Sequence, residues 1–505
     1  MTALSCGISS KKQASKPTAS PTISVSDSPS PSPSSSDALE SFYSQQLSWK
    51  SCQDGFDCTT VTVPLNYADP TAGSIKLQLV RHKAKSGKPK GNLVVNPGGP
   101  GGSGIEYARA LSYIMTEQLI NNFNVIGFDP RGVGSSNPVK CLNDKAIDAY
   151  VSADQSPDNQ SEIDKYVALA KQLADGCAAR SPQIYKYMDT VSAARDIDII
   201  RAALGDEKLN WFGKSYGTFL GATYAGLFPT HVGRMMLDGA IDPTLTNEKL
   251  SYGQALGFEN ALKRFVANCA TQSDCPLKAG NAGVQQVANM LANLDSKPGK
   301  LANGRVFTQA IGLIGVLGDL YDANYGWSDL RMALKDALKG DFTALASSAD
   351  MYISRDENGH FTDNGNEAIA AVNCLDRPDR ASVQETEKLA TQWSKQAPLF
   401  GSSLAWGNLG CTYWPIPATG KPGPITASGS PTIVVVGTVN DPATPYPWAV
   451  ALSKQLAKGV LLTFNGDGHT AYFQGSTCVD GYIDNYFLTG DAKSGVTCQP
   501  DSSAD

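Results

Sequence analysis

Short apolar runs alternate with amphipathic stretches in the first half of the chain. The runs "NLVVN", "FNVIGF", "LNWFG" and "RMMLD" predict buried strands. Between two of them, "DTVSAARDIDIIRAALG" has apolar residues at helical spacing and ends at Gly205, a typical helix stop. Strands that alternate with helices predict a largely parallel sheet covered on both faces, which is an α/β fold.

Three further segments complete the pattern. Near the start, "CTTVTVPLNYADPTAGSIKLQLVRHKA" alternates apolar and polar residues around a D-P-T-A-G turn, which predicts a β-hairpin. From about 244 to 428, long helical stretches such as "QQVANMLANLD" occur with no clear buried strand, before "PTIVVVGTVND" and "GVLLTFNGDG" resume the strand pattern. We therefore expect residues 41–243 and 429–505 to form the core, and residues 244–428 to form an inserted, mainly helical cap.

The first forty residues differ from the rest. Residues 1–40 contain "SKPTASPTISVSDSPSPSPSSSD", which has too few large apolar side chains to bury a core, so we expect a flexible tether. Cys6, followed by glycine and this tether, is typical of a lipidated bacterial lipoprotein start, although Leu4 stands two positions before the cysteine instead of three. The alternative is an ordinary cysteine in a disordered tail.

Composition narrows the possible partners. The 505 residues carry a net charge of −6 and contain no basic patch, so nucleic acid is not an expected partner. No apolar run reaches the about 18 residues that span a bilayer, and "AIGLIGVLGDLY" is predicted to be a helix of the cap or core. We expect a monomer.

The cysteines indicate export. There are eleven, and setting Cys6 aside leaves an even number with no metal-type CxxC pair, as expected in an oxidising compartment. Spacing alone does not determine the connectivity. We expect the pairs Cys52–Cys58, Cys141–Cys177, Cys269–Cys275, Cys374–Cys411 and Cys478–Cys498.

The stretch "LNWFGKSYGTFLGATYAG" contains the strongest chemical signal. Gly213, Ser215 and Gly217 lie between a predicted strand and a small-residue helix, which is the pattern of a nucleophile elbow. Glycines are needed there because a Cβ would collide with the neighbouring strand or helix. The helix N-terminus also favours an oxyanion above it.

A serine nucleophile needs a base, and only four histidines are available. His82 lies in a predicted strand, His231 in a polar loop, and His360 in a hydrophilic turn of the cap. His469 directly follows the last apolar strand, where the sites of parallel sheets are found. We predict that His469 is the base.

The acid partner has two candidates. Asp441 ends the strand "IVVVGTVND" and gives the chain order Ser, Asp, His of α/β-hydrolases. Asp467 is the alternative, but it lies only two residues before His469 and is better placed to cap the loop. We predict Asp441.

An oxyanion hole requires unobstructed backbone N–H groups. Tyr216, directly after the nucleophile, should supply one, and the loop "NPGGPGGSG" should supply the other, from Gly99 or, second, Gly98. This loop lacks the GK[ST] ending of a phosphate loop, and the chain has no HExxH motif. We predict no cofactor and no metal.

Several of these segments together resemble a known family. The motifs "NPGGPGGSG", "FDPRGVGSS", "GKSYGTFLGATYAGLFP", "LDGAIDP", "NCLDRP", "DPATPYPWA" and "GDGHT" are similar to the secreted tripeptidyl aminopeptidases of actinomycetes, relatives of proline iminopeptidase with the α/β-hydrolase fold. The resemblance covers residues 49–498 and includes the family's TAP-like C-terminal region.

This resemblance implies an exported serine exopeptidase that releases short peptides, typically tripeptides, from free N-termini, with Ser215, Asp441 and His469 as its triad.

Two residues depart from the relatives' pattern. Pro97 stands where proline iminopeptidases have the histidine of His-Gly-Gly-Pro, and Lys214 replaces a neutral elbow residue, which leaves substrate preference open.

An exopeptidase also needs an anchor for the substrate ammonium group. Asp376 in "NCLDRP" is the candidate, since a carboxylate facing the pocket would form a charge-assisted hydrogen bond, and a surface acid is the alternative. Because fold does not determine substrate, a carboxylesterase with the same triad remains possible. A catalytically inactive surface lipoprotein is a third possibility, which the intact triad disfavours.

Overall fold

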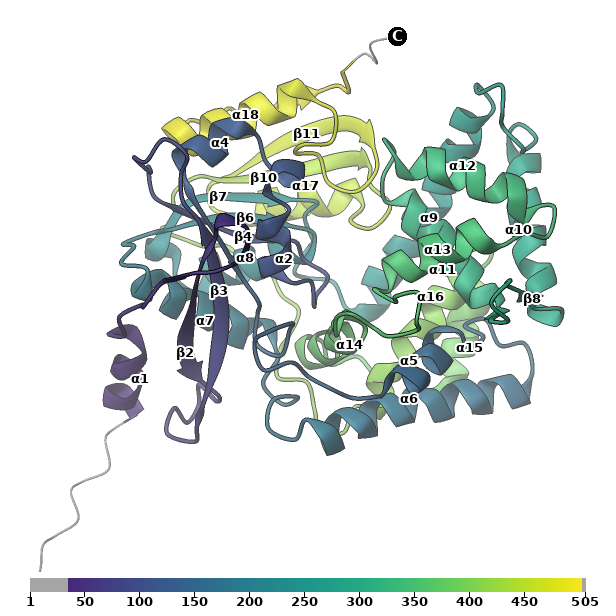
Figure 1. The fold of residues 1–505 in the computed structure, drawn as a ribbon, viewed down its shortest axis with the longest axis horizontal. Coiled ribbons are helices and arrows are strands. Elements are labelled where there is room, and N and C mark those ends of the chain that lie inside the picture. The colour runs from purple at the N-terminus through teal and green to yellow at the C-terminus, as the bar shows by residue number, and fades with distance from the viewer. Residues whose placement is uncertain (1–34, 502–505) are drawn as a thin grey trace, which may run out of the picture.

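A twisted ten-stranded sheet forms the centre of the protein in the computed structural model, which describes residues 35–501 (Figure 1). The strand order is β1-β2-β3-β5-β4-β6-β7-β10-β11-β12. From β5 to β12 neighbouring strands are parallel, and β1, β2 and β3 form an antiparallel edge that joins β5. The predicted α/β fold and the hairpin of β2 with β3 are confirmed.

The strands have the following bounds: β1 Lys50–Ser51, β2 Asp57–Pro64, β3 Ser74–His82, β4 Asn92–Asn96, β5 Asn124–Phe128, β6 Leu209–Lys214, β7 Val232–Asp238, β10 Ile433–Asn440, β11 Gly459–Asp467 and β12 Val496–Cys498. Helices α7 (Thr190–Ala203), α8 (Tyr216–Leu227) and α17 (Tyr446–Gln455) cover one face. Helices α2 (Gly104–Arg109), α4 (Glu117–Asn122) and α18 (Thr477–Thr489) cover the other.

Burial on both faces explains why the strands read as continuous apolar runs. In β10, Ile433 and Val435 pack with α7, α8 and α17, whereas Val434 and Val436 pack with α4 and α18. Successive side chains of a strand point to opposite faces, so each face receives every second residue. Each fully buried aliphatic side chain contributes about 1.5–3 kcal/mol, which makes this double-sided core the main stabilising element.

A helical layer lies beside the carboxyl ends of the parallel strands (Figure 1). Its own core contains Phe258, Phe265, Leu291 and Trp327. The helices of this layer are α9 Asn247–Cys269, α10 Asn281–Ser296, α11 Gln309–Leu320, α12 Gly326–Ala337, α13 Thr343–Tyr352, α14 Gly365–Asp376, α15 Val383–Trp393 and α16 Gly401–Gly407. Helix α11 is the apolar stretch expected to be a cap or core helix, and it is buried in this layer.

Details of this layer differ from the sequence pattern. A short antiparallel pair, β8 (Gly299–Lys300) with β9 (Val306–Phe307), occurs where no strand was predicted, because two-residue strands are too short to show a period. Helix α6 (Gln160–Arg180) lies before residue 244, yet it packs through Tyr166 on Trp406 of α16. Helix α14 packs through Ala368 and Ala371 into the cluster that covers the sheet.

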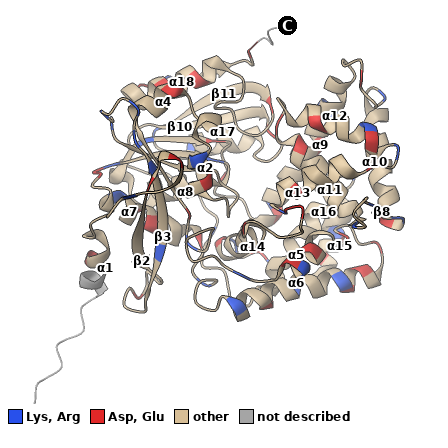
Figure 2. Ribbon diagram, in the orientation of Figure 1, with Lys and Arg blue, Asp and Glu red and all other residues tan. Residues whose placement is uncertain are grey.

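Five disulfides join the cysteine pairs expected from the sequence. Cys6 lies outside the described residues. Among residues 35–501, no helix has both the length and the apolar composition needed to cross a membrane. Basic and acidic residues are interspersed over the ribbon (Figure 2).

Candidate active site

Ser215 occupies a strained turn between β6 and α8. Its backbone has φ 55° and ψ −126°, and its N–H donates to the carbonyl of Asp238 at 2.8 Å. A Cβ on Gly217 would lie 2.8 Å from the carbonyl oxygen of Asn96, and one on Gly213 would run into the carbonyl of Gly217. The turn is therefore a nucleophile elbow that requires both flanking glycines.

His469 is held in the loop that follows β11. Its Nδ1 lies 2.9 Å from Oδ1 of Asp441, and its backbone N–H donates to the carbonyl of Tyr321 at 2.7 Å. The Tyr321 ring contacts the imidazole edge to face, with centroids 5.2 Å apart. These contacts use Nδ1 and leave Nε2 available to a reacting group.

Asp441 is buried at the start of the loop after β10, and both of its carboxylate oxygens accept hydrogen bonds. Its carboxylate accepts from the N–H groups of Ala443, Thr444 and Thr470 at 2.8–3.1 Å and from the Thr444 hydroxyl at 2.8 Å. The alternative acid, Asp467, points away and forms an ion pair with Arg264 of α9. The structure thus brings Asp441, and not Asp467, to the histidine.

Ser215 and His469 line one cavity of about 490 Å³, closed on one side by α9, α11 and α14. The loop 97–102 and the aromatic rings of Tyr321 and Phe258 complete its wall. In the described residues Ser215 and His469 do not hydrogen-bond to each other. Such contacts are often long without substrate and tighten when it binds.

Two backbone N–H groups are free to bind an oxyanion. Neither Gly99 nor Tyr216 donates its N–H to any group in the described part of the chain, and both residues line the cavity. The N–H of Gly98 is engaged by the Asn96 side chain at 3.0 Å. Gly98 packs on the elbow instead, since a Cβ there would lie 2.7 Å from the carbonyl of Lys214. The geometry therefore favours Gly99 over Gly98.

Lys214, the unusual elbow residue, points away from the cavity. Its Nζ donates to the carbonyl of Tyr472 at 2.7 Å and lies 3.9 Å from the carboxylate of Asp238. That carboxylate also accepts the N–H groups of Ala471 and Tyr472. Burial lowers the pKa of Lys214 and raises that of Asp238, and their mutual attraction opposes both shifts. The pair clamps the loop that carries His469.

Asp376, the predicted amine anchor, does not reach this cavity. It is buried at the end of α14, where it accepts the N–H and hydroxyl of Thr190 at 2.7 and 2.6 Å, and that hydroxyl bonds to Tyr216. Burial raises the pKa of Asp376 to about 6. The expectation of a substrate contact is not met because Asp376 faces the N-terminus of α7.

Two charged residues of the cavity wall were not predicted as site residues. Asp363 is the one carboxylate, and Arg377 the one lysine or arginine, among the described residues that line the cavity. Arg377 stands inside the motif "NCLDRP", directly after Asp376, so this motif does bring a charged side chain to the cavity wall, but not that of the predicted residue. Asp363 lies in a polar turn that carries no sequence signal.

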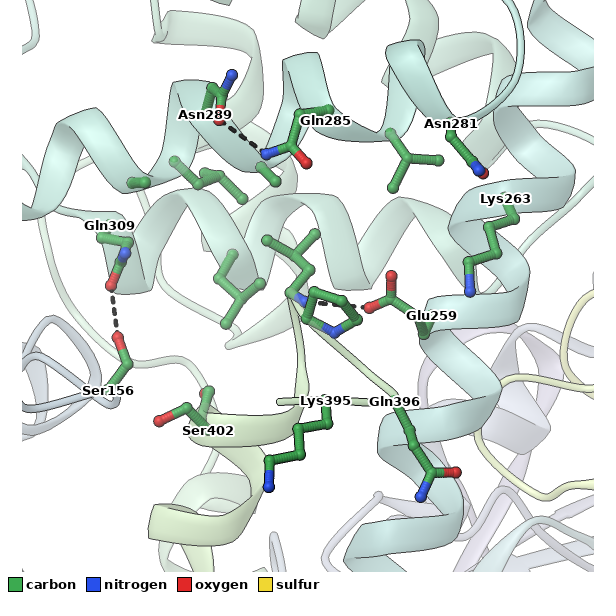
Figure 3. A pocket seen from close by; sticks show the side chains of 18 residues that line it. Ser156, Glu259, Lys263, Asn281, Gln285, Asn289, Gln309, Lys395, Gln396 and Ser402 are labelled. Carbon is green, nitrogen blue, oxygen red and sulfur yellow. Dashed lines mark hydrogen bonds between the residues drawn. The ribbon is translucent and has the colours of Figure 1, made fainter. Parts of the chain in front are cut away.

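A second cavity, of about 570 Å³, lies within the helical layer away from the triad (Figure 3). Its wall is rich in amide side chains, and Gln309 is bonded there to Ser156 at 2.8 Å. Glu259 accepts the N–H of Leu399 at 3.1 Å in the same wall. Among residues 35–501, no group of three or more His, Cys, Asp or Glu side chains could hold a metal ion.

Comparison with known proteins identifies the family of the chain. Residues 91–282 match the family described as alpha/beta hydrolase fold, and residues 397–498 match the family described as TAP-like protein. The chain is 35% identical to Serine protease Hip1 of Mycobacterium tuberculosis over 480 residues, which cover 90% of this chain and 91% of the relative.

Two further relatives are similar over the same extent. Carboxylesterase B of Mycobacterium tuberculosis is 36% identical over 476 residues, covering 90% of each chain. Tripeptidyl aminopeptidase of Streptomyces lividans is 31% identical over 474 residues, covering 90% of this chain and 87% of the relative.

Proposed function

The chain belongs to the α/β-hydrolase family that includes the actinomycete tripeptidyl aminopeptidases and is a serine hydrolase, and from this premise we propose that it is an exported exopeptidase. It would release short peptides, typically tripeptides, from free N-termini. The observation that carries this proposal is the Asp441–His469 pair, which shares a cap-covered cavity with the Ser215 elbow.

The proposed triad acts by acyl transfer. Ser215 Oγ attacks the carbonyl carbon of the scissile bond while His469 Nε2 takes the hydroxyl proton. The imidazolium then protonates the leaving amine, the C–N bond breaks, and water hydrolyses the acyl-enzyme with His469 again acting as base. Asp441 holds the Nδ1–H tautomer and stabilises the imidazolium.

Charge that develops on the carbonyl oxygen is assigned to the free N–H groups of Gly99 and Tyr216. Tyr216 is the first residue of α8, so the positive end of this helix dipole also faces the oxyanion. The elbow positions the Tyr216 donor and the loop 97–102 positions the Gly99 donor before substrate arrives, which avoids reorganisation during the reaction.

The substrate ammonium group is assigned to Asp363 in place of Asp376. Asp363 lies at the N-terminal end of α14 and presents the one carboxylate in the described cavity wall. Its oxygens accept the Ser354 hydroxyl at 2.7 Å and the N–H of Gly365 at 2.9 Å, which fixes its orientation. A carboxylate retains lone pairs for a charge-assisted bond to an ammonium group.

Export is supported by the five disulfides, because such bonds persist in oxidising compartments. We propose that residues 1–40 act as the tether and that Cys6 is a lipid attachment site. Mass spectrometry of the protein purified from membranes tests this: a diacylglyceryl mass on the Cys6 peptide supports it, and an unmodified peptide contradicts it.

The experiment for the activity compares Ala-Ala-Pro-nitroanilide, Pro-nitroanilide and N-acetyl-Ala-Ala-Pro-nitroanilide for the wild type and Ser215→Ala. We expect cleavage of the free tripeptide, and its loss on acetylation and in the variant. Asp363→Asn should reduce the preference for the free amine over the acetylated form. Asp376→Asn is the matched control, since its carboxylate does not face the cavity, and should keep that preference.

A carboxylesterase is the second candidate, favoured by the 36% identity to Carboxylesterase B. The triad serves esters and amides alike, so the same experiment includes a short p-nitrophenyl ester. Ester turnover without cleavage of any tripeptide substrate would contradict the peptidase proposal and support the esterase.

A further inference from the structure

Arg377 places a buried positive charge in the wall of the cavity that holds Ser215. Only 3% of its surface is exposed, and it follows α14 directly. It packs over the Phe219 ring at 5.2 Å. The triad mechanism has no use for a cation at this position.

The hydrogen bonds of Arg377 leave one end of the guanidinium open. Nε donates to the carbonyl of Leu245 at 3.1 Å, and Nη1 donates to Oδ1 of Asn373 at 3.3 Å. Nη2 donates no hydrogen bond to any described residue. It is not one of the fully buried atoms without a hydrogen-bond partner, so part of its surface is accessible. Arg377 lines the Ser215 cavity, where an anion could approach this open end.

No carboxylate of residues 35–501 forms an ion pair with Arg377. Arg131, buried to a similar degree, forms a two-point pair with Asp196 at 2.6 and 2.7 Å. Asp376, the neighbour of Arg377 in the chain, is engaged by Thr190 instead. Asp376 and Asp379 are near enough to attract Arg377, but neither forms an ion pair with it. An anion hydrogen-bonded to the open end of the guanidinium would offset the cost of burying this cation.

We propose that Arg377 binds a carboxylate of the substrate and makes the enzyme selective for acidic peptides. Arginine suits this task because its planar fork binds carboxylates with directed hydrogen bonds and stays protonated at working pH. The carboxylate could be an aspartate or glutamate side chain or the C-terminus of a short peptide. With Asp363 as the ammonium site, the cavity would hold both charges of a zwitterionic ligand.

This inference rests on the proposed function only in taking the substrate to be a peptide. The binding of a carboxylate by Arg377 does not depend on the proposed function. The experiment measures kcat/KM for tripeptide nitroanilides with Glu or Gln at each of the three positions. A second pair, Ala-Ala-Pro-Ala and its C-terminal amide, distinguishes a terminal from a side-chain carboxylate. A third pair, p-nitrophenyl hydrogen glutarate and its methyl ester, measures the preference for the acid over the neutral compound if the enzyme is an esterase.

We expect the wild type to prefer the acid over its neutral partner by about 10- to 100-fold in at least one pair, as a charged hydrogen bond implies. Arg377→Gln should bring that ratio near one, and Arg377→Lys should keep part of it. Arg195→Gln is the control: the Arg195 guanidinium lies over the Tyr67 ring and does not line the cavity, so the ratio should stay.

Because each ratio compares two substrates of one preparation, a partial folding defect in Arg377→Gln does not change it. The inference is overturned if the wild type shows no acid preference in any pair, a result that needs no variant. It is also overturned if the preference survives in Arg377→Gln. Failure of the peptidase proposal looks different: all peptides stay uncleaved while the ester pair still reports on Arg377.

Discussion

Replacing Lys214 by methionine tests the clamp behind the elbow. The substitution keeps most of the side-chain volume but removes the cation from its partner Asp238, whose carboxylate has no exposed surface. Asp238 keeps the N–H groups of Ala471 and Tyr472. The variant therefore leaves a buried, partly satisfied negative charge beneath the loop that carries His469.

The magnitude follows from the 3.9 Å between Nζ and the carboxylate oxygen. At an effective dielectric constant of about 20, two unit charges at this distance attract by about 4 kcal/mol. Removal of one partner of a buried pair typically costs about 3–5 kcal/mol, because the other charge stays desolvated. We expect Lys214→Met to lower the free energy of unfolding by a similar amount, and the double variant Lys214→Met/Asp238→Asn to lose less than the sum of the singles.

Urea unfolding of the oxidised protein, followed by tryptophan fluorescence, measures these changes. The surface substitution Lys208→Met serves as the control and should stay within about 0.5 kcal/mol of the wild type. A loss below 1 kcal/mol for Lys214→Met, or additive losses in the double variant, would refute the reasoning. The kcat of Lys214→Met should also fall, since the clamped loop positions His469.

Four further outcomes are expected. Asp441→Asn should lower kcat about 10⁴-fold through the wrong imidazole tautomer, measured by steady-state kinetics. Gly98→Ala should lower kcat about 10²- to 10³-fold, because its Cβ would lie 2.8 Å from the oxyanion donor Tyr216 N. Burial raises the pKa of Asp376 from 3.8 to about 6, so the folded state binds this proton more tightly and stability falls as pH rises across that window. Asp376→Asn should flatten that part of the Tm–pH curve. Cys374→Ser/Cys411→Ser opens a bridge of sequence separation 37 and should cost about 4 kcal/mol in urea unfolding.

Each of these expectations has a contradicting result. Unchanged kcat in Asp441→Asn would mean that another acid serves His469, and full activity in Gly98→Ala would remove the loop from the oxyanion hole. Parallel Tm–pH curves for wild type and Asp376→Asn would show that the carboxyl titrates normally. The double serine variant is compared with the wild type under non-reducing conditions, and equal unfolding midpoints would contradict the loop-closure estimate.

The sequence by itself determined the elements and the residues that depend on local backbone geometry. The continuous apolar runs of the buried strands, the glycines around Ser215, and the strand-end positions of Asp441 and His469 can all be read from short segments of the chain. The even set of cysteines also paired as expected. Because parallel strands end at the same edge of the sheet, residues that directly follow neighbouring strands lie close together, independently of the segments that connect the strands.

Only the tertiary structure decided which charges face the substrate cavity. Asp376 and Arg377 are adjacent in the chain, but Asp376 is hydrogen-bonded to Thr190 at the start of α7, whereas Arg377 lines the cavity. Lys214 is likewise drawn beneath the histidine loop by Asp238. These choices depend on contacts between segments far apart in sequence, where the direction of one side chain is set by the packing of several elements and not by its neighbours in the chain.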